Sequence, residues 1–274
     1  MKKLLSLLLA AIMLTMCLFA VSCNKTDDGK VSDTDAETEP AGPAVTRSFL
    51  AGYEVAESEQ TSQISARVLI NLWNDGKMDI YVGADEGEGL KTAQYTGTYS
   101  LGENAEFDET ISFTYTYADG QTATVTDKVI LDGIFETPFY IGSAMTTVDV
   151  KFYESAPAST DGDVYVGYLT KTAGMGAMVY AYSLCIKDDG KFDVSIMQMA
   201  PSISMHVWGS SEGTYVIDGD KITFTYDASD GEGGIAAEDL TAEGTDYSEN
   251  GFKTGFNIGQ VNIRASAADF IKVK

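Results

Sequence analysis

The sequence contains one histidine, His206, and only three cysteines, Cys17, Cys23 and Cys185. A catalytic triad or a metal site built from several histidines is therefore largely excluded within one chain. The sequence also has no glycine-rich phosphate loop, no paired-cysteine motif and no dinucleotide fingerprint. We therefore expect a protein that is not an enzyme and that carries no cofactor.

Basic residues are also scarce, because 18 Lys and Arg stand against 41 Asp and Glu, with a formal net charge of −23 at pH 7. Nucleic-acid binding requires Lys and Arg to displace counterions from phosphates, so no nucleic-acid partner is expected. The same charge disfavours adsorption onto anionic lipid. Apolar residues still make up 44% of the chain, which is enough for a folded core. We interpret the acidity as a source of solubility and expect a monomer.

The N-terminus has the three-part layout of a secretory signal. Two lysines open the segment, an apolar run covers residues 4–20, and Ala20-Val21-Ser22-Cys23 closes it. This last motif resembles the lipobox of bacterial lipoproteins, with Ala in place of the commoner Leu at the first position. The resemblance implies cleavage before Cys23 and a diacylglyceryl group on its sulfur. More than one acyl chain then holds a protein stably at a bilayer.

Residues 23–47, which follow the predicted signal peptide (1–22), are polar, acidic and proline-bearing, so we expect a disordered acidic tether. The prediction is an extracytoplasmic protein anchored to the bilayer of the cell membrane through acylated Cys23. If the host has two membranes, Asn24 fits the outer membrane, by resemblance to sorted lipoproteins. An uncleaved transmembrane helix is the alternative, although the apolar run is slightly short for one. Once Cys17 has left with the signal, Cys185 has no cysteine partner for an intrachain disulfide.

From residue 48 onward, many runs alternate apolar and polar residues, which is typical of half-buried β-strands. Asp-Gly and Asn-Gly pairs separate these runs and favour two-residue hairpin turns, because both residue types tolerate positive φ. We expect an antiparallel meander with strands near 49–56, 65–74, 77–84, 93–102, 109–118, 121–131, 134–142, 146–154, 163–172, 177–188, 191–199, 206–217, 221–228, 236–243, 252–258 and 261–272.

The second half of the chain repeats the first. NDGKMDIY at 74–81 nearly recurs as DDGKFDVS at 188–195, and YTGTYSL and ISFTYTY recur in the same order as SEGTYVI and ITFTYDA. The apolar positions around the first turn also match those around its copy: Val68, Ile70, Leu72, Met78, Ile80 and Val82 correspond to Tyr182, Leu184, Ile186, Phe192, Val194 and Ile196. The sequence therefore predicts two related domains, at 48–156 and 162–274.

Eight tilted antiparallel strands with short connections can close into an up-and-down barrel. We therefore predict an all-β protein with two tandem eight-stranded barrels; two β-sandwiches are the alternative, since strand patterning does not establish closure. The GTY motif followed by a turn and ITFTY resembles the lipocalin-like domains of bacterial surface lipoproteins. This resemblance implies a calyx for an apolar molecule. The chain departs from true lipocalins because it lacks the Gly-x-Trp pattern near the first strand and any disulfide.

Aromatic residues on the apolar faces could line such a calyx, with hydroxyl groups to orient a ligand. They could equally fill the core. The main hypothesis is non-catalytic binding of a small apolar or amphiphilic ligand inside the barrels; the alternative is a structural or adhesive surface module with solid cores that contacts a protein or a glycan. The candidate ligand-binding residues are Tyr95, Tyr99, Phe113 and Tyr115 in the first copy and Tyr180, Tyr182, Phe224 and Tyr226 in the second.

Copper binding is a minor alternative. Met197, Met199, Met205 and His206 lie close together in the sequence, and thioether and imidazole groups are suitable ligands for Cu(I). Met also fills irregular gaps in cores, and packing is the simpler interpretation of this cluster. We therefore expect no metal site.

Overall fold

The computed structural model describes residues 42–55, 64–85, 87, 89–117, 120–141, 146–173, 176–200, 205–228, 237–256 and 267–274. The predicted signal peptide, Cys23 and most of the predicted tether lie outside these ranges. Residues Gly42–Lys274 form one compact unit. Within the described ranges, no helix is long and apolar enough to cross a bilayer.

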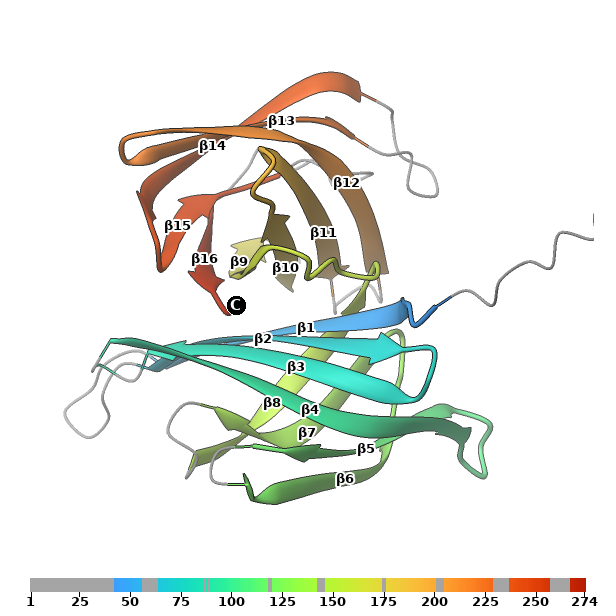
Figure 1. Ribbon diagram of the computed structural model, residues 1–274. Coiled ribbons are helices and arrows are strands. Elements are labelled where there is room, and N and C mark those ends of the chain that lie inside the picture. The colour runs from blue at the N-terminus through green and yellow to red at the C-terminus, as the bar shows by residue number, and fades with distance from the viewer. Residues whose placement is uncertain are drawn as a thin grey trace, which may run out of the picture. The chain divides into compact units, whose positions relative to one another are not determined.

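The first half of the unit is one eight-stranded antiparallel sheet that curls around a core (Figure 1). Its strands follow the order β6-β5-β4-β3-β2-β1-β8-β7. Their bounds are β1 Val45–Val55, β2 Ile64–Trp73, β3 Lys77–Asp85, β4 Leu90–Glu103, β5 Glu109–Thr116, β6 Thr122–Val129, β7 Ile134–Ile141 and β8 Thr146–Ser155.

This first barrel is nearly closed. Among its described residues, β6 and β7 are joined only by the Leu131–Ile134 bridge at their turn. Asp127 in β6 has a positive φ of 45°, and the pairing of β5 with β6 shifts register between Ile111 and Phe113. Pro138 in β7 has no backbone N–H to donate. A bulge on one edge and a proline on the other are common ways to prevent further strand pairing, so the seam stays open.

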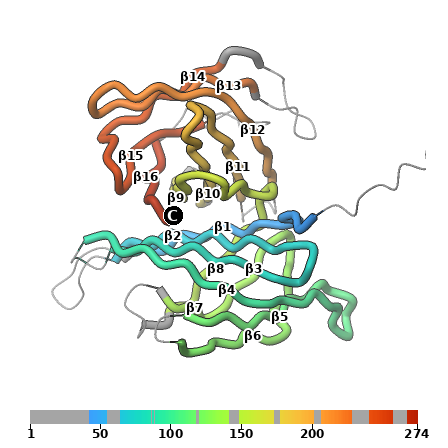
Figure 2. The backbone as a smooth tube through the Cα atoms, viewed as in Figure 1, coloured from blue at the N-terminus to red at the C-terminus, as the bar shows by residue number. Residues whose placement is uncertain are grey.

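The second half is a closed barrel with strand order β10-β11-β12-β13-β14-β15-β16-β9. The chain reaches it from β8 through residues 156–162 (Figure 2). The bounds are β9 Asp163–Ala173, β10 Gly176–Ile186, β11 Lys191–Ala200, β12 Met205–Asp218, β13 Lys221–Ala228, β14 Ala237–Ser248, β15 Gly251–Thr254 and β16 Ala268–Lys272.

These two barrels confirm the predicted fold and exclude the pair of β-sandwiches. Individual strand ends differ from the expected ones. β1 begins at Val45, so residues 45–47, which we assigned to the tether, belong to the strand. Arg47 is held there by ion pairs with Glu109 at 2.6 Å and Glu154 at 2.7 Å. β14 continues to Ser248, and residues 257–266 between β15 and β16 lie outside the described residues.

Aromatic rings pack against one another inside each barrel. In the first barrel, the rings of Phe135 and Phe152 stack with centroids 4.9 Å apart, and Phe49 meets Phe135 edge-on at 5.0 Å. In the second, Phe192 and Phe224 lie 4.9 Å apart, and Phe252 stacks on Phe270 at 5.3 Å. The residues that match between the two copies around the first hairpin belong to these two cores.

A third apolar cluster joins the outer faces of the two barrels. Its first-barrel members include Leu50, Leu69 and Tyr81, and its second-barrel members include Met197 and Met199. The strands that supply them are buried on both faces, since β2 and β11 are buried along nearly their whole length. The two barrels are therefore held together by a third apolar core, which is separate from the cores inside them.

Candidate functional site

The repeated hairpins form two equivalent corners of the two barrels. In each corner, the tyrosine of the GTY motif (Tyr99 or Tyr215) makes hydrogen bonds to the hairpin backbone. The Tyr99 hydroxyl donates to the carbonyl of Trp73 at 2.8 Å, and the Tyr99 N–H donates to the carbonyl of Gly76 at 3.0 Å. In the second copy, Tyr215 makes both bonds at 3.0 Å, with the carbonyls of Lys187 and Gly190. Tyr99 therefore fixes a hairpin, and it packs, partly buried, against the core that contains the other ligand-binding candidates of its barrel.

The side chains at the two corners carry different chemistry on the same frame. The Trp73 indole N–H donates to Asp79 at 2.9 Å. Lys187 stands at the equivalent place and pairs with Asp193, the counterpart of Asp79, at 2.5 Å. Both copies thus have a side chain held by an aspartate at this corner, an indole in the first and an ammonium group in the second.

The segment between β8 and β9 lies over the boundary of the two barrels and is held through Ala158. The Ala158 N–H donates to the Ser48 hydroxyl at 2.8 Å, and its carbonyl accepts from the Asn71 amide at 3.1 Å. Ser48 in turn donates to Asn71 at 2.6 Å, and both side chains are fully buried. Because Ala158 is bound at both polar groups, this segment forms a fixed ridge.

Two hollows flank this ridge, and we call them together the junction trough. One has a volume of about 1010 Å³ and the other about 560 Å³. They share Pro157, Ser159 and Asp161. The smaller hollow is completed by Val45, Trp73, Ala158 and Thr160, and the larger by Lys187, Asp189, Lys191, Phe192, Asp193, Val194, Ser195, Ser210, Ser211, Glu212, Gly213, Thr214 and Asp227.

Charges in the centre of the trough are fixed by hydrogen bonds. The Asp161 carboxylate accepts from Ser159 at 2.6 Å and from the Cys185 thiol at 3.3 Å, and it pairs with Lys187 at 3.3 Å. These bonds, that from Ser159 first, lower the pKa of Asp161 to about 2. Hydrogen bonding to Asp193 raises the pKa of Lys187. Burial raises the pKa of Cys185 to about 11, so its thiol stays protonated at neutral pH.

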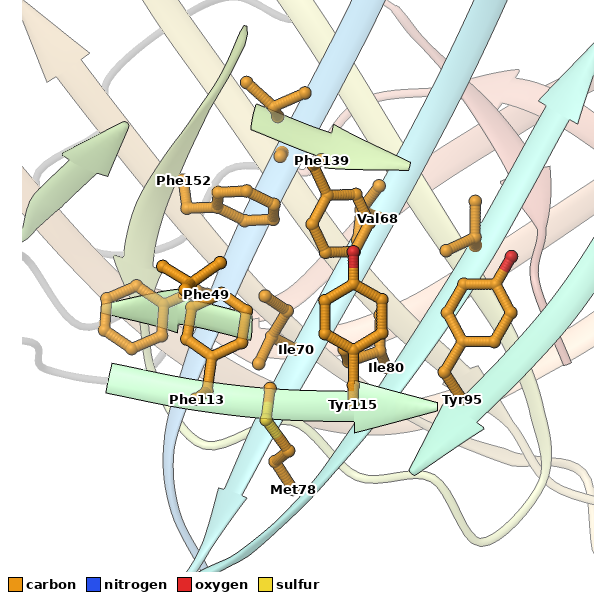
Figure 3. Packing of buried hydrophobic residues seen from close by; sticks show 14 of the residues in the cluster. Phe49, Val68, Ile70, Met78, Ile80, Tyr95, Phe113, Tyr115, Phe139 and Phe152 are labelled. Carbon is orange, nitrogen blue, oxygen red and sulfur yellow. The ribbon is translucent and has the colours of Figure 1, made fainter. Parts of the chain in front are cut away.

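Most of the predicted ligand-binding residues lie in the two cores. Tyr95 and Phe113 lie within about 6 Å of Tyr115, at ring-centroid distances of 5.9 and 6.0 Å (Figure 3). The Tyr115 hydroxyl is buried without a hydrogen bond of ordinary geometry among the described residues, although the backbone of Tyr140 is close.

In the second barrel, the predicted residues pack against other rings. Tyr182 lies 5.4 Å from Phe270, and Tyr226 lies 5.5 Å from Phe256. Phe224 belongs to the same core, and the Tyr180 hydroxyl lies 3.5 Å from the sulfur of Met178. These contacts bring the predicted residues together as packing partners.

The copper candidates lie at the boundary between the barrels. Met197 and Met199 are 0% and 3% exposed and belong to the cluster that joins the barrels. Pairing places Met199 opposite His206, whose Nε2 is 2.8 Å from the Glu154 carbonyl oxygen. The side chain of Met205 lies outside the described residues. In the part of the chain that the structure describes, no three His, Cys, Asp or Glu side chains gather as a metal site.

Sequence reasoning missed both the trough and the boundary that creates it. One signal was available, because the run VSIMQMA in β11 carries apolar side chains on both faces, a pattern typical of strands that are covered on both sides. Comparison with protein-family models, with curated proteins and with solved structures gives no significant match for this chain.

Proposed function

We propose that this protein is a non-catalytic, lipid-anchored binding module of the cell surface that recognises a polar ligand in the junction trough. The observation that carries the proposal is the larger hollow, of about 1010 Å³, lined by hydroxyl, carboxylate and ammonium groups. Its volume is at the upper end of the usual range for ligand sites, about 300–1,000 Å³.

Rigid backbone beneath the trough supports this proposal. Asp193, Ser195, Ser210 and Glu212 come from the paired strands β11 and β12, which fixes their spacing. Ala158 fixes the ridge in the middle. A site that is ordered before binding loses less conformational entropy when the ligand arrives, and so binds more tightly.

The outer surface is favoured over the barrel interiors because of the way the cores are packed. Ring centroids lie as close as 4.3 Å in the first core and 4.9 Å in the second, which means that the aromatic rings are in contact. A ligand inside either barrel would have to displace these rings. A ligand in the trough displaces solvent alone.

A blocking variant tests the proposal. The mature chain, with Cys23→Ser to keep it soluble, is compared with the same chain carrying Glu212→Trp, which places a large ring in the larger hollow. Thr96→Trp is the matched control, since Thr96 is exposed on the corresponding strand of the first barrel, outside both hollows. The probes are neutral oligosaccharides, oligolysine peptides and N-phenyl-1-naphthylamine, an apolar dye.

We expect at least one polar probe to bind in calorimetry, to lose binding in Glu212→Trp, and to keep it in Thr96→Trp. Binding that is the same in both variants, or no binding of any polar probe, would overturn the proposal.

Binding of an apolar or amphiphilic molecule in the first barrel is the second candidate. Two observations favour it: the seam between β6 and β7, and the buried Tyr115 hydroxyl without an ordinary hydrogen bond. A buried hydroxyl without a partner is unfavourable by about 1–3 kcal/mol, and a ligand with an acceptor atom would relieve that cost.

This second candidate predicts that the apolar dye binds to the protein. It also predicts that Tyr115→Phe weakens the binding of amphiphiles that carry an acceptor atom, such as palmitic acid. Equal affinity of the parent chain and Tyr115→Phe for palmitic acid would exclude Tyr115 as a ligand-binding residue.

A further inference from the structure

We propose that the ligand of the junction trough is a neutral carbohydrate chain that stacks one sugar ring on Trp73 while its hydroxyl groups bind the carboxylates around Lys187. This inference rests on the proposed function of the trough and specifies its ligand class. It follows from the different side chains that the two copies place at equivalent corners.

Trp73 supplies a flat apolar surface whose orientation is fixed at two points. Its indole N–H is held by Asp79 at 2.9 Å, and its backbone carbonyl is held by Tyr99 at 2.8 Å. The side chain is only partly buried and lines the smaller hollow beside Val45 and Pro157. Because aromatic rings interact well with flat apolar groups, this fixed ring is suited to the C–H face of a sugar.

The larger hollow supplies the polar half of such a site. Asp161 and Asp193 accept from Lys187 at 3.3 and 2.5 Å, so one ammonium group offsets one of the two negative charges and holds both carboxylates in place. Carboxylate oxygens have several lone pairs each and can accept further hydrogen bonds from sugar hydroxyl groups. Hydrogen bonds that involve an ionised group are also the stronger ones.

The two hollows can serve one ligand because they share Pro157, Ser159 and Asp161. An extended chain could therefore place one sugar on Trp73 and the next ones beside Asp161. A compact ligand would reach only one of the two hollows, so the shared lining favours an oligomer.

Charge separates this ligand from other polar polymers. The larger hollow contains five acidic side chains, Asp161, Asp189, Asp193, Glu212 and Asp227, but only two lysines, Lys187 and Lys191. The excess of carboxylates repels polyanions such as nucleic acid, acidic polysaccharide and phosphate-rich lipid headgroups. A cationic peptide is the remaining competitor. We favour the neutral sugar over the cation, because Asp161 and Asp193 are already paired with Lys187 and because the Trp73 indole in the smaller hollow offers a flat apolar surface.

The test uses the mature Cys23→Ser chain and a panel of neutral hexasaccharides: β-1,4-glucose, α-1,4-glucose, β-1,4-xylose, β-1,4-mannose and β-1,4-N-acetylglucosamine. We expect at least one of them to bind and to change the fluorescence of Trp73. Trp73→Leu should weaken that binding by about tenfold, the usual effect of losing one well-oriented aromatic contact. The matched control is Trp208→Leu, since Trp208 is 50% exposed and lines neither hollow. It should leave the affinity unchanged.

Trp73 packs against its hairpin, so the fold of Trp73→Leu is checked by thermal unfolding, and Trp73→Phe is measured beside it as a variant that keeps a smaller ring. An intermediate affinity in Trp73→Phe supports stacking. Oligolysine binding that is lost in Glu212→Trp, with no hexasaccharide bound, would overturn the carbohydrate class and leave the trough as a binding site. If no polar probe responds to Glu212→Trp, the trough proposal fails too.

Discussion

The hydroxyl of Tyr99 donates a hydrogen bond to the backbone carbonyl of Trp73 at 2.8 Å, across the corner where β4 passes the end of β2. Tyr215 makes the equivalent bond to Lys187 at 3.0 Å. The repeated GTY motif therefore stabilises the hairpin. Its tyrosine holds the backbone of the residue that lines the junction trough, which is Trp73 in the first copy and Lys187 in the second. The backbone arrangement is the same at both corners. The two corners therefore differ in the side chain that they expose, an indole at Trp73 and an ammonium group at Lys187.

Removing either tyrosine hydroxyl should loosen its corner. We expect Tyr99→Phe and Tyr215→Phe each to lower the free energy of unfolding by about 1 kcal/mol, the net value of one hydrogen bond. Urea denaturation measures this change, and Thr98→Ala, an exposed neighbour on β4, is the control. Tyr99→Phe should also weaken ligand binding, because Tyr99 holds the Trp73 carbonyl. Tyr215→Phe should affect the contacts that the ligand makes around Lys187, because Tyr215 holds the Lys187 carbonyl. A stability equal to that of the parent chain in both variants would contradict the stabilising role of the two hydrogen bonds.

The glycine of each GTY motif is required by a close approach of the neighbouring strand. A Cβ at Gly97 would lie 2.2 Å from the carbonyl oxygen of Thr114, and one at Gly213 would lie 2.1 Å from that of Thr225. Gly97→Ala and Gly213→Ala should therefore each destabilise the protein by about 1–3 kcal/mol through backbone displacement. Gly42→Ala is the control, because a Cβ there meets nothing within 4 Å. Thermal unfolding of the three variants, measured at one pH, tests this ranking.

The apolar cluster that joins the barrels should make them unfold together. Met197→Asp would bury an unpaired charge in that cluster, where the native side chain is 0% exposed. A buried charge without a partner is strongly unfavourable. We expect differential scanning calorimetry to show one transition for the parent chain and two for Met197→Asp, as the halves separate. Val216→Asp is the control, because Val216 is 68% exposed on β12; two transitions in the parent chain would mean that the boundary does not couple the halves.

The sequence predicts the hairpins well because their signals are local. Asp132-Gly133 adopts the expected two-residue turn, with φ values of 51° and 74°. At Asp75-Gly76 and Asp189-Gly190 only the glycine has a positive φ, of 80° and 81°, so the hairpins are confirmed but with a longer turn than expected. The alternating runs beside them fix which residues enter the cores. Order and type of the strands therefore follow from short stretches of sequence.

The parts that could not be predicted depend on contacts between residues far apart in the chain. Alternation puts Tyr99 on an inward face, but only the folded hairpin supplies the Trp73 carbonyl as its partner. The trough depends on Ala158, which is fixed by Ser48 and Asn71 from the first barrel. The open seam depends on how Asp127 and Pro138 interrupt the two edge strands. Composition alone does not show such relationships.

Asp161 should contribute a pH-dependent part of the stability. Its pKa is lowered from the ordinary 3.8 to about 2, first by the Ser159 hydroxyl and then by Cys185 and Lys187. A lowered carboxyl pKa stabilises the fold above the unfolded pKa, and this contribution is lost as the pH falls from about 4 towards about 2. The effect is small, because the Asp161 side chain is 63% exposed. Asp161→Asn should flatten the stability profile in that window, as measured by urea denaturation, whereas Asp149→Asn, an exposed control on β8, should leave it unchanged.

Lipid attachment is tested by comparing the two cysteines near the N-terminus. Cys23 follows Ala20-Val21-Ser22, whereas Cys17 follows the bulky Met16, which a lipobox does not favour at that position. In a bacterial host, we expect Cys23→Ser to abolish the incorporation of an alkyne-tagged palmitate and to move the protein from the membrane fraction to the soluble fraction. Cys17→Ser should do neither, since that residue belongs to the segment predicted to be cleaved as a signal peptide. The net charge of −23 gives the folded unit no electrostatic attraction to anionic lipid, so loss of the acyl chains should be enough for release. Retention of Cys23→Ser in the membrane fraction would point instead to an uncleaved apolar segment, and N-terminal sequencing of that fraction would then begin before residue 23.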